Sequence, residues 1–170
     1  MKLTIDPVTT PAQIDAVAAL ARTIWFEHYP GIISWAQVHY MLQRDYSRAV
    51  VSAELARGVR WDLAAAGASP LGFAAYRVDG DAVMIDKLYV LAASRGRGTA
   101  RRLVARVEAF ARETGCAHLR LTVNKRNLSS IRAYLRLGFA FEASVTKPIG
   151  YGFLMDDYAM KRELADDRAQ

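Results

Sequence analysis

The chain has 170 residues, of which 52% are hydrophobic and 24% are charged, and it carries a formal net charge of +6 with a pI of 9.7. This composition excludes a disordered, collagen-like or fibrous protein, and the length suits one domain with one core. The longest uncharged stretch, residues 63–76, is interrupted by two glycines and a proline, so we expect no membrane-spanning segment.

The cysteine content and the first residues bear on the cellular compartment. One cysteine, Cys116, excludes an internal disulfide. Residues 1–7 lack the apolar core of a secretory signal. A reducing, cytoplasmic setting is therefore the expectation.

The first third of the chain is expected to be mainly helical after a short strand at residues 3–5. Thr10 has the character of a helix N-cap, with Pro11 at the first helical position and Gln13 three residues after the cap. This helix is expected to end at Tyr29-Pro30-Gly31. Two further helices are expected, at residues 35–46, with Ser34 as the N-cap, and at residues 49–57.

After Gly58 the pattern changes to strands that alternate with helices. Three strands are expected first, at residues 61–66, 71–78 and 83–91, with residues 67–70 as the turn between the first two. A helix then runs to about Thr114, with an apolar stripe at helical spacing: Ala100, Leu103, Val104, Val107, Phe110 and Ala111. A strand, a second helix and a final antiparallel pair follow, at residues 118–123, 128–137, 139–145 and 153–160. This order predicts an α/β (α+β layered) domain with a mostly antiparallel mixed sheet, over residues 1–165, followed by a polar tail at 166–170.

The most informative segment is the glycine-rich turn at residues 94–100, which lies between the third strand of this series and the helix after it. The first N–H groups of a helix have no intrahelical partners, glycine allows close approach to the backbone, and the helix dipole adds partial positive charge. These features predict a phosphate or pyrophosphate site. Basic residues surround this turn and a second one: Arg95, Arg97, Arg101, Arg102 and Arg106, then Lys125, Arg126 and Arg132.

Other phosphate-binding motifs do not fit this turn. A dinucleotide fingerprint counted from Gly96 requires a small residue where Arg101 stands. A P-loop requires a Gly-Lys-Ser/Thr ending, which the sequence lacks. The remaining alternative from the residues alone is that the glycines form an ordinary loop and the arginines a solvated helix face.

Two motifs in the correct order resemble those of the GNAT superfamily, the acetyl-CoA-dependent N-acetyltransferases. The cofactor motif, Arg/Gln-x-x-Gly-x-Gly/Ala, reads Arg95-Gly96-Arg97-Gly98-Thr99-Ala100 here and follows Leu88-Tyr89-Val90. The second motif, Asn-x-x-Ala/Ser-Ile-x-x-Tyr-x-x-x-Gly-Phe, is matched from Asn127 to Phe139. The resemblance covers residues 83–141 and implies a single GNAT-like domain, acetyl-CoA as cosubstrate and no metal.

The resemblance also implies cofactor-binding roles. Backbone groups of Leu88 and Val90 would hold the pantetheine arm. The residues of the cofactor motif would hold the pyrophosphate: Arg95, Gly96, Arg97, Gly98, Thr99 and Ala100. Asn127 and Ser130 would add a second anchor. From the residues alone, an ordinary N-cap is the favoured interpretation of Asn127, and only the resemblance favours a cofactor contact.

For catalysis, the resemblance places Tyr134 as the general acid, because a phenol is protonated at pH 7 and can donate to the departing thiolate. The alternative is a core tyrosine beside Ile131. Asp86 and Glu27 are the candidate general bases, with His28 or water as alternatives, and each has a plain reading as surface charge.

The predicted function is transfer of an acetyl group from acetyl-CoA to a primary amine of a small molecule, peptide or protein. An acyl-CoA-binding sensor or scaffold without transfer activity is the main alternative. The arginines also suggest nucleic-acid binding, but the sequence lacks interleaved basic and aromatic residues. Neither nucleic acid nor a membrane is expected as a partner. Similarity to the family leaves a homodimer open.

Overall fold

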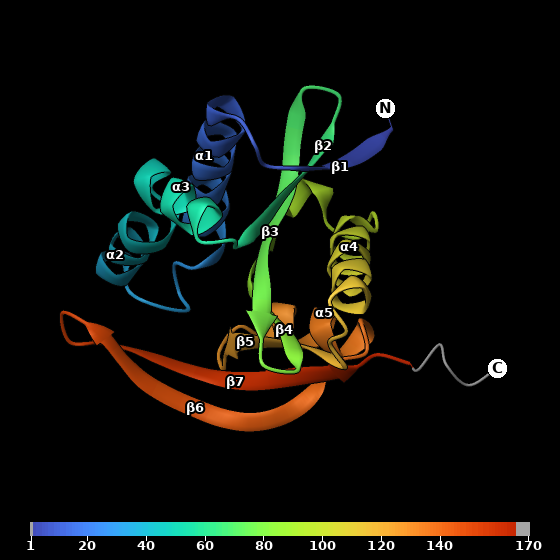
Figure 1. Ribbon diagram of the computed structural model, residues 1–170. Helices are drawn as coiled ribbons and strands as arrows, with labels where there is room; N and C mark the ends of the chain where they lie inside the picture. The colour runs from blue at the N-terminus through green and yellow to red at the C-terminus, as the bar shows by residue number, and fades with distance from the viewer. Residues whose placement is uncertain (1, 166–170) are drawn as a thin grey trace. The chain divides into compact units, whose positions relative to one another are not determined.

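The computed structural model describes residues 2–165 (Figure 1), so the predicted polar tail at 166–170 lies outside the described residues. The described strands form one sheet in the order β1-β2-β3-β4-β5-β7-β6. Their bounds are β1 (Leu3–Pro7), β2 (Arg60–Ala66), β3 (Ser69–Asp79), β4 (Ala82–Val90), β5 (His118–Asn124), β6 (Ala140–Gly150) and β7 (Phe153–Glu163). The helices are α1 (Pro11–His28), α2 (Trp35–Tyr46), α3 (Arg48–Ala56), α4 (Thr99–Glu113) and α5 (Leu128–Arg136), with a short 3₁₀ turn η1 (Ala92–Ser94).

The sheet is mixed, as the sequence predicts. β4 pairs with β5 in parallel. By contrast, β1 with β2, β2 with β3, β5 with β7 and β6 with β7 are antiparallel pairs. The α/β fold class and the predicted order of elements are confirmed. By backbone contacts the described chain divides into two compact units, residues 2–77 with 87–105 and residues 78–86 with 106–165. The prediction of one domain over residues 1–165 stays a prediction.

In the first unit, α1, α2 and α3 pack against one another (Figure 1). The predicted cap of α1 is confirmed: the Thr10 hydroxyl accepts from the Gln13 N–H, and the Gln13 side chain accepts from the Thr10 N–H, which completes a capping box. Ser34 caps α2 and Ser47 caps α3 through the same kind of side-chain bond. The fully buried side chains of this unit include Val17, Ile24, Trp61 and Phe73.

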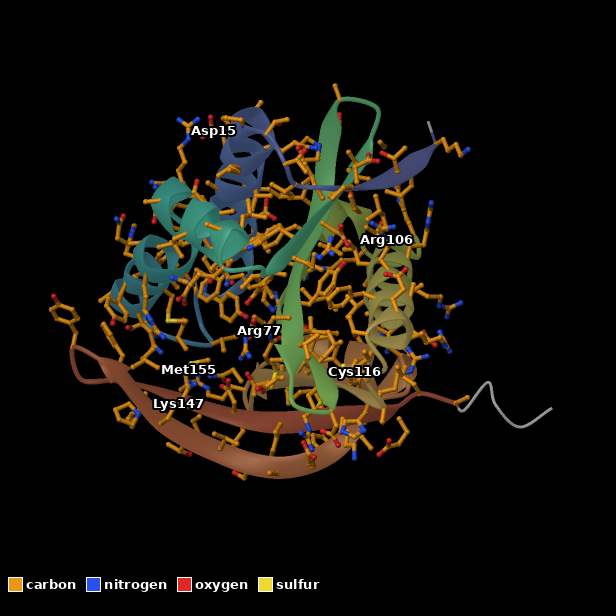
Figure 2. All side chains as sticks on the ribbon, viewed as in Figure 1. Asp15, Arg77, Arg106, Cys116, Lys147 and Met155 are labelled. Atoms are coloured by element: carbon orange, nitrogen blue, oxygen red, sulfur yellow. The ribbon has the colours of Figure 1, made fainter. Side chains whose placement is uncertain are left out.

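In the second unit, β6 and β7 form a long curved hairpin (Figure 1). Lys147 on β6 pairs in register with Met155 on β7, and both residues are labelled in Figure 2. β6 is the edge strand of the sheet, and most of its residues are exposed. The core of this unit includes Leu119 and Met160, both fully buried.

Several element bounds differ from the sequence-based expectation. β6 and β7 extend to Gly150 and Glu163, beyond the predicted ends at 145 and 160, because backbone pairing continues where the side chains show no apolar alternation. Pro70, predicted in a turn, belongs to β3. The helix α4 matches its predicted apolar stripe: Leu103, Val104, Val107 and Ala111 are all buried.

Gly72 on β3 marks a close approach to β4. A Cβ atom at this position would lie 2.6 Å from the Tyr89 carbonyl oxygen and 3.1 Å from Val90 Cγ2. Real Cβ atoms do not come within 3.0 Å of a backbone atom, so one of the two strands would have to move. Glycine is therefore required here by space, and the position of β4 at residues 89–90 depends on it.

We predict that Gly72→Ala lowers the free energy of unfolding by about 1–3 kcal/mol, the usual cost of overpacking. Urea denaturation measures this change. Gly80→Asn is the control, because Gly80 has open space around its Cα and a φ of +63° that asparagine tolerates, so it should change stability by only a few tenths of a kcal/mol. An alanine variant as stable as the parent would contradict the close contact.

Candidate cofactor and catalytic site

The glycine-rich turn lies between η1 and α4, in the first unit. Gly96 has a φ of +74° and Gly98 a φ of +82°, both in the region that favours glycine. An added Cβ would meet nothing within 4 Å at either position. Backbone conformation, and not lack of space, therefore accounts for glycine at both positions.

The backbone amides that start α4 are unpaired. The first main-chain bond of the helix runs from the Arg102 N–H to the Gly98 carbonyl, at 3.0 Å. Within residues 2–165, the N–H groups of Arg97, Gly98, Thr99 and Ala100 have no hydrogen-bond acceptor. Because α4 has 15 residues, its dipole also contributes partial positive charge at this end. Successive unpaired N–H groups of this kind can bind an anion.

Arg95 has a structural role that the sequence does not reveal. Its Nε donates a hydrogen bond to the Val90 carbonyl at 3.1 Å, which ties the turn to the end of β4. The structure thus brings Arg95 and Val90 together. Leu88 is half-buried two residues earlier on the same strand. The side chains of Arg97, Arg101 and Arg102 are exposed around the start of α4 and add positive charge there.

The second motif lies in the second unit, and Asn127 is its buried anchor, with 3% of its surface exposed. Its side-chain oxygen accepts from the Ser130 N–H at 3.3 Å and from the Ser129 hydroxyl at 3.3 Å. The N-cap interpretation of Asn127 is therefore confirmed. A cofactor contact by Asn127 or by the half-buried Ser130 stays a prediction.

Tyr134 lies on α5, half-buried, with its ring against Phe139 in an edge-to-face contact at 6.0 Å. Burial of the phenol raises its pKa from 10 to about 12. Its hydroxyl has no hydrogen-bond partner in the part of the chain that the structure describes. The group is thus protonated at neutral pH, and its proton is not engaged by a neighbouring side chain.

The two candidate bases differ in their surroundings. Glu27 is exposed in the last turn of α1, and its carboxylate makes no ion pair or hydrogen bond with residues 2–165. Asp86 is exposed on β4, in the second unit. The half-buried His28 packs its ring edge-on against Tyr29 at 5.2 Å.

A buried ion pair in the first unit was not predicted from the sequence. Lys87, 7% exposed, donates to both carboxylate oxygens of Glu54, at 3.0 and 3.1 Å. Glu54 also accepts from Trp61 Nε1 at 3.0 Å, and Lys87 Nζ lies 4.9 Å from the centre of the Trp61 ring. A lysine among apolar residues of the predicted strand at 83–91, where Asp86 is the other charged residue, was the available signal. Removing one partner of such a pair costs about 3–5 kcal/mol, so this network fixes α3 to β2 and β4.

Two aspartates on β7 have opposite electrostatic surroundings. A hydrogen bond from Lys125, with a second from Thr146, lowers the pKa of Asp156. Burial raises the pKa of Asp157, and a hydrogen bond with Thr122 partly offsets this effect. Lys125, a basic residue of the second turn, is thus held by a carboxylate of its own unit.

Neither a membrane-spanning helix nor a metal-binding cluster occurs in the described residues. Among residues 2–165, no helix combines the length and the apolar character needed to cross a bilayer. The same part of the chain contains no group of three or more His, Cys, Asp or Glu side chains placed to hold a metal ion.

Three known proteins that resemble this chain in sequence or in structure are all named acetyltransferases. The streptothricin acetyltransferase of Streptomyces lavendulae is 42% identical over 72 residues, which are 41% of this chain and 38% of that protein, so the chain spans less than half the length of this relative. The crystal structure of the PaiA N-acetyltransferase from Thermoplasma acidophilum in complex with coenzyme A matches with a TM-score of 0.85 at 20% identity, over 96% of this chain and all of that one. A nourseothricin acetyltransferase structure matches with a TM-score of 0.57 at 26% identity, over 63% of this chain and 66% of that one.

A family model supplies the decisive match. The model of the acetyltransferase (GNAT) family matches residues 16–139, well over half of the chain. The matched range includes both the unpaired amides at the start of α4 and the motif from Asn127 to Phe139. With the confirmed fold class, this match establishes that the chain belongs to the GNAT family of acetyltransferases.

Proposed function

We propose that this protein transfers an acetyl group from acetyl-CoA to a primary amine by direct attack of the amine on the thioester. The observation that carries the proposal is the set of unpaired N–H groups from Arg97 to Ala100, at a turn that carries the family's cofactor motif. These groups suit the negatively charged pyrophosphate that joins the adenosine and pantetheine parts of CoA. The PaiA structure, which contains coenzyme A, supports CoA as the ligand class.

In this proposal the cofactor is held by backbone groups more than by side chains. The amides of Gly96 through Ala100 bind the pyrophosphate, while backbone groups of Leu88 and Val90 hold the pantetheine arm. Arg95 keeps the turn and β4 in register through its bond to Val90. Asn127 and Ser130 are proposed as a further cofactor contact in addition to their capping bond.

The reaction forms a C–N bond and breaks the C–S bond of the thioester. The amine loses a proton, and the CoA thiolate gains one as it leaves. We assign the donated proton to Tyr134, because its raised pKa keeps the phenol protonated and its hydroxyl is not engaged in the described residues. Glu27 or Asp86 would receive the amine proton, directly or through water. Most of the rate enhancement would come from holding amine and thioester in line.

The acceptor class can be narrowed from the names of the relatives. Streptothricin acetyltransferase and nourseothricin acetyltransferase are named for antibiotics. We therefore propose a small-molecule amine of this kind as the first acceptor to test. Peptide and protein amines are the second group.

The proposed activity is tested with acetyl-CoA and a panel of amines that contains streptothricin, polyamines, amino acids and a peptide with a free N-terminus. Release of free thiol measures transfer, and mass spectrometry identifies the acetylated product. We expect turnover with at least one amine. Saturable binding of acetyl-CoA without thiol release from any amine would instead support a sensor or scaffold.

The contribution of the glycine-rich turn is tested by Gly98→Ala. Alanine is strained at a φ of +82° and would shift the neighbouring amides, so we expect affinity for CoA to fall about tenfold. Gly115→Ala is the matched control, because Gly115 has a φ of +73°, open space around it and a place at the other end of α4. Calorimetric titration of both variants should show the loss only for Gly98→Ala; equal affinities would argue against the turn as the binding site.

The role of Tyr134 is tested by Tyr134→Phe. Loss of a general acid typically costs about 10²-fold or more in kcat, whereas affinity for acetyl-CoA and stability should barely change, since the hydroxyl has no partner among residues 2–165. With a pKa of about 12, the phenol stays protonated as the pH rises to 10, so the parent enzyme should show no alkaline loss of activity from this group below that pH. An undiminished kcat in the phenylalanine variant would remove Tyr134 from the mechanism.

A further inference from the structure

Three tyrosine hydroxyls from separate elements meet in the first unit. Tyr29 forms the C-cap of α1, Tyr46 is the last residue of α2, and Tyr89 lies on β4. The hydroxyl oxygens of Tyr29 and Tyr89 are 3.2 Å apart, although 60 residues separate them in the sequence. Tyr46 forms a side-chain hydrogen bond with Tyr89. The cluster therefore joins the ends of α1 and α2 to β4.

Ring packing holds these hydroxyls in place. The Trp25 ring stacks on Tyr29 with centroids 4.1 Å apart, and it also contacts Tyr46 at 5.4 Å and Tyr89 at 5.9 Å. Phe73 on β3 contacts Tyr89 at 5.6 Å. Because the rings are fixed by these contacts, removal of a single hydroxyl would take away the hydrogen bond and leave the packing intact.

Tyr29 also organises the loop that joins α1 to α2, residues 30–34. Its carbonyl accepts from the N–H of Ile32 at 2.8 Å and from the N–H of Ile33 at 3.1 Å. The loop ends at Ser34, which caps α2. One residue thus binds β4 through its side chain and the loop through its main chain.

The place of Tyr89 on β4 links this cluster to the reaction. Its neighbours Leu88 and Val90 are the residues proposed to hold the pantetheine arm, so the thioester would lie along this part of the strand. An amine that attacks the thioester must approach β4 near Tyr89. The loop tied to Tyr89 through Tyr29 is then close enough to shape the path of the acceptor.

We infer that the hydroxyl pair of Tyr29 and Tyr89 is a positioning contact that fixes the loop of residues 30–34 against β4 and so sets the affinity for the amine acceptor. The inference rests on the proposed function, since it requires that β4 carries the thioester. Neither tyrosine exchanges a proton with the substrate. Both act through the placement of the loop.

The alternative is that the pair only adds stability to the core. A structural hydroxyl contact of this kind already exists elsewhere in the same unit: Tyr76 donates to Asp62 Oδ2 at 2.7 Å, and both residues are buried. Tyr76→Phe is therefore the matched control. It should lower the thermal midpoint without changing kinetic constants for the acceptor.

The test uses Tyr29→Phe, Tyr89→Phe and the double variant, each in the whole 170-residue chain. We expect each single change to raise the acceptor KM about three- to tenfold, the effect of one lost hydrogen bond, with little change in kcat or in affinity for acetyl-CoA. The double variant should be no worse than the worse single one, because both changes break the same contact. Unchanged KM values, or effects that multiply in the double variant, would overturn the inference.

Hydrogen exchange supplies a readout that does not depend on activity. The amides of Ile32 and Ile33, which donate to the Tyr29 carbonyl, should exchange faster in both single variants and stay protected in Tyr76→Phe. Protection that does not change in Tyr29→Phe and Tyr89→Phe would show that the hydroxyl pair does not hold the loop, and the inference would fail. Absence of thiol release from the parent protein with every amine would overturn the proposed function instead, and the exchange result would still decide whether the loop is held.

Discussion

Cofactor binding, as proposed, depends on a small group of main-chain N–H groups that have no partner in the described structure. At the start of α4, the amides of Arg97 to Ala100 are directed by two glycines whose φ angles of +74° and +82° other residues rarely adopt. An unpaired amide is costly when it is buried, but at an accessible helix start it can bind water or an anionic ligand. The bond from Arg95 to the Val90 carbonyl fixes this turn to β4.

Two polar networks hold β4 from the same side, one at Lys87 and the other two residues further along the strand, at Tyr89. Lys87 pairs with Glu54 of α3, and Tyr89 meets Tyr29 and Tyr46 at the ends of α1 and α2. Because residues two apart lie on the same face of a strand, both networks connect this face of β4 to the three N-terminal helices. The close approach at Gly72 holds the same segment from β3. The strand proposed to carry the thioester is thus fixed by an ion pair, a hydroxyl cluster and direct backbone contact.

The sequence predicts those features that depend on residues close together in the chain, and it does not predict contacts between residues far apart. The capping box of Thr10 and Gln13, the caps at Ser34 and Asn127, and the apolar stripe of α4 depend on residues within a few positions of one another, and all are confirmed. The contacts between Lys87 and Glu54 and between Tyr29 and Tyr89 join residues 33 and 60 positions apart, so no local pattern indicates them. The end of β6 was predicted too early because an exposed edge strand does not need apolar alternation. The end of β7 was predicted too early because its last three residues, 161–163, are charged, although they still pair with β5. The roles assigned to Tyr134, Glu27 and Asp86 rest on resemblance, and they stay predictions.

The most direct test of the central claim is an NMR titration of the backbone amides at the start of α4. Acetyl-CoA should shift the ¹⁵N–¹H resonances of Gly96 to Ala100 strongly and saturably. Acetyl-pantetheine, which lacks the pyrophosphate, should leave these five resonances almost unchanged. If acetyl-CoA bound while the five amides did not move, or if both compounds moved them equally, the pyrophosphate would lie elsewhere and the account would be contradicted.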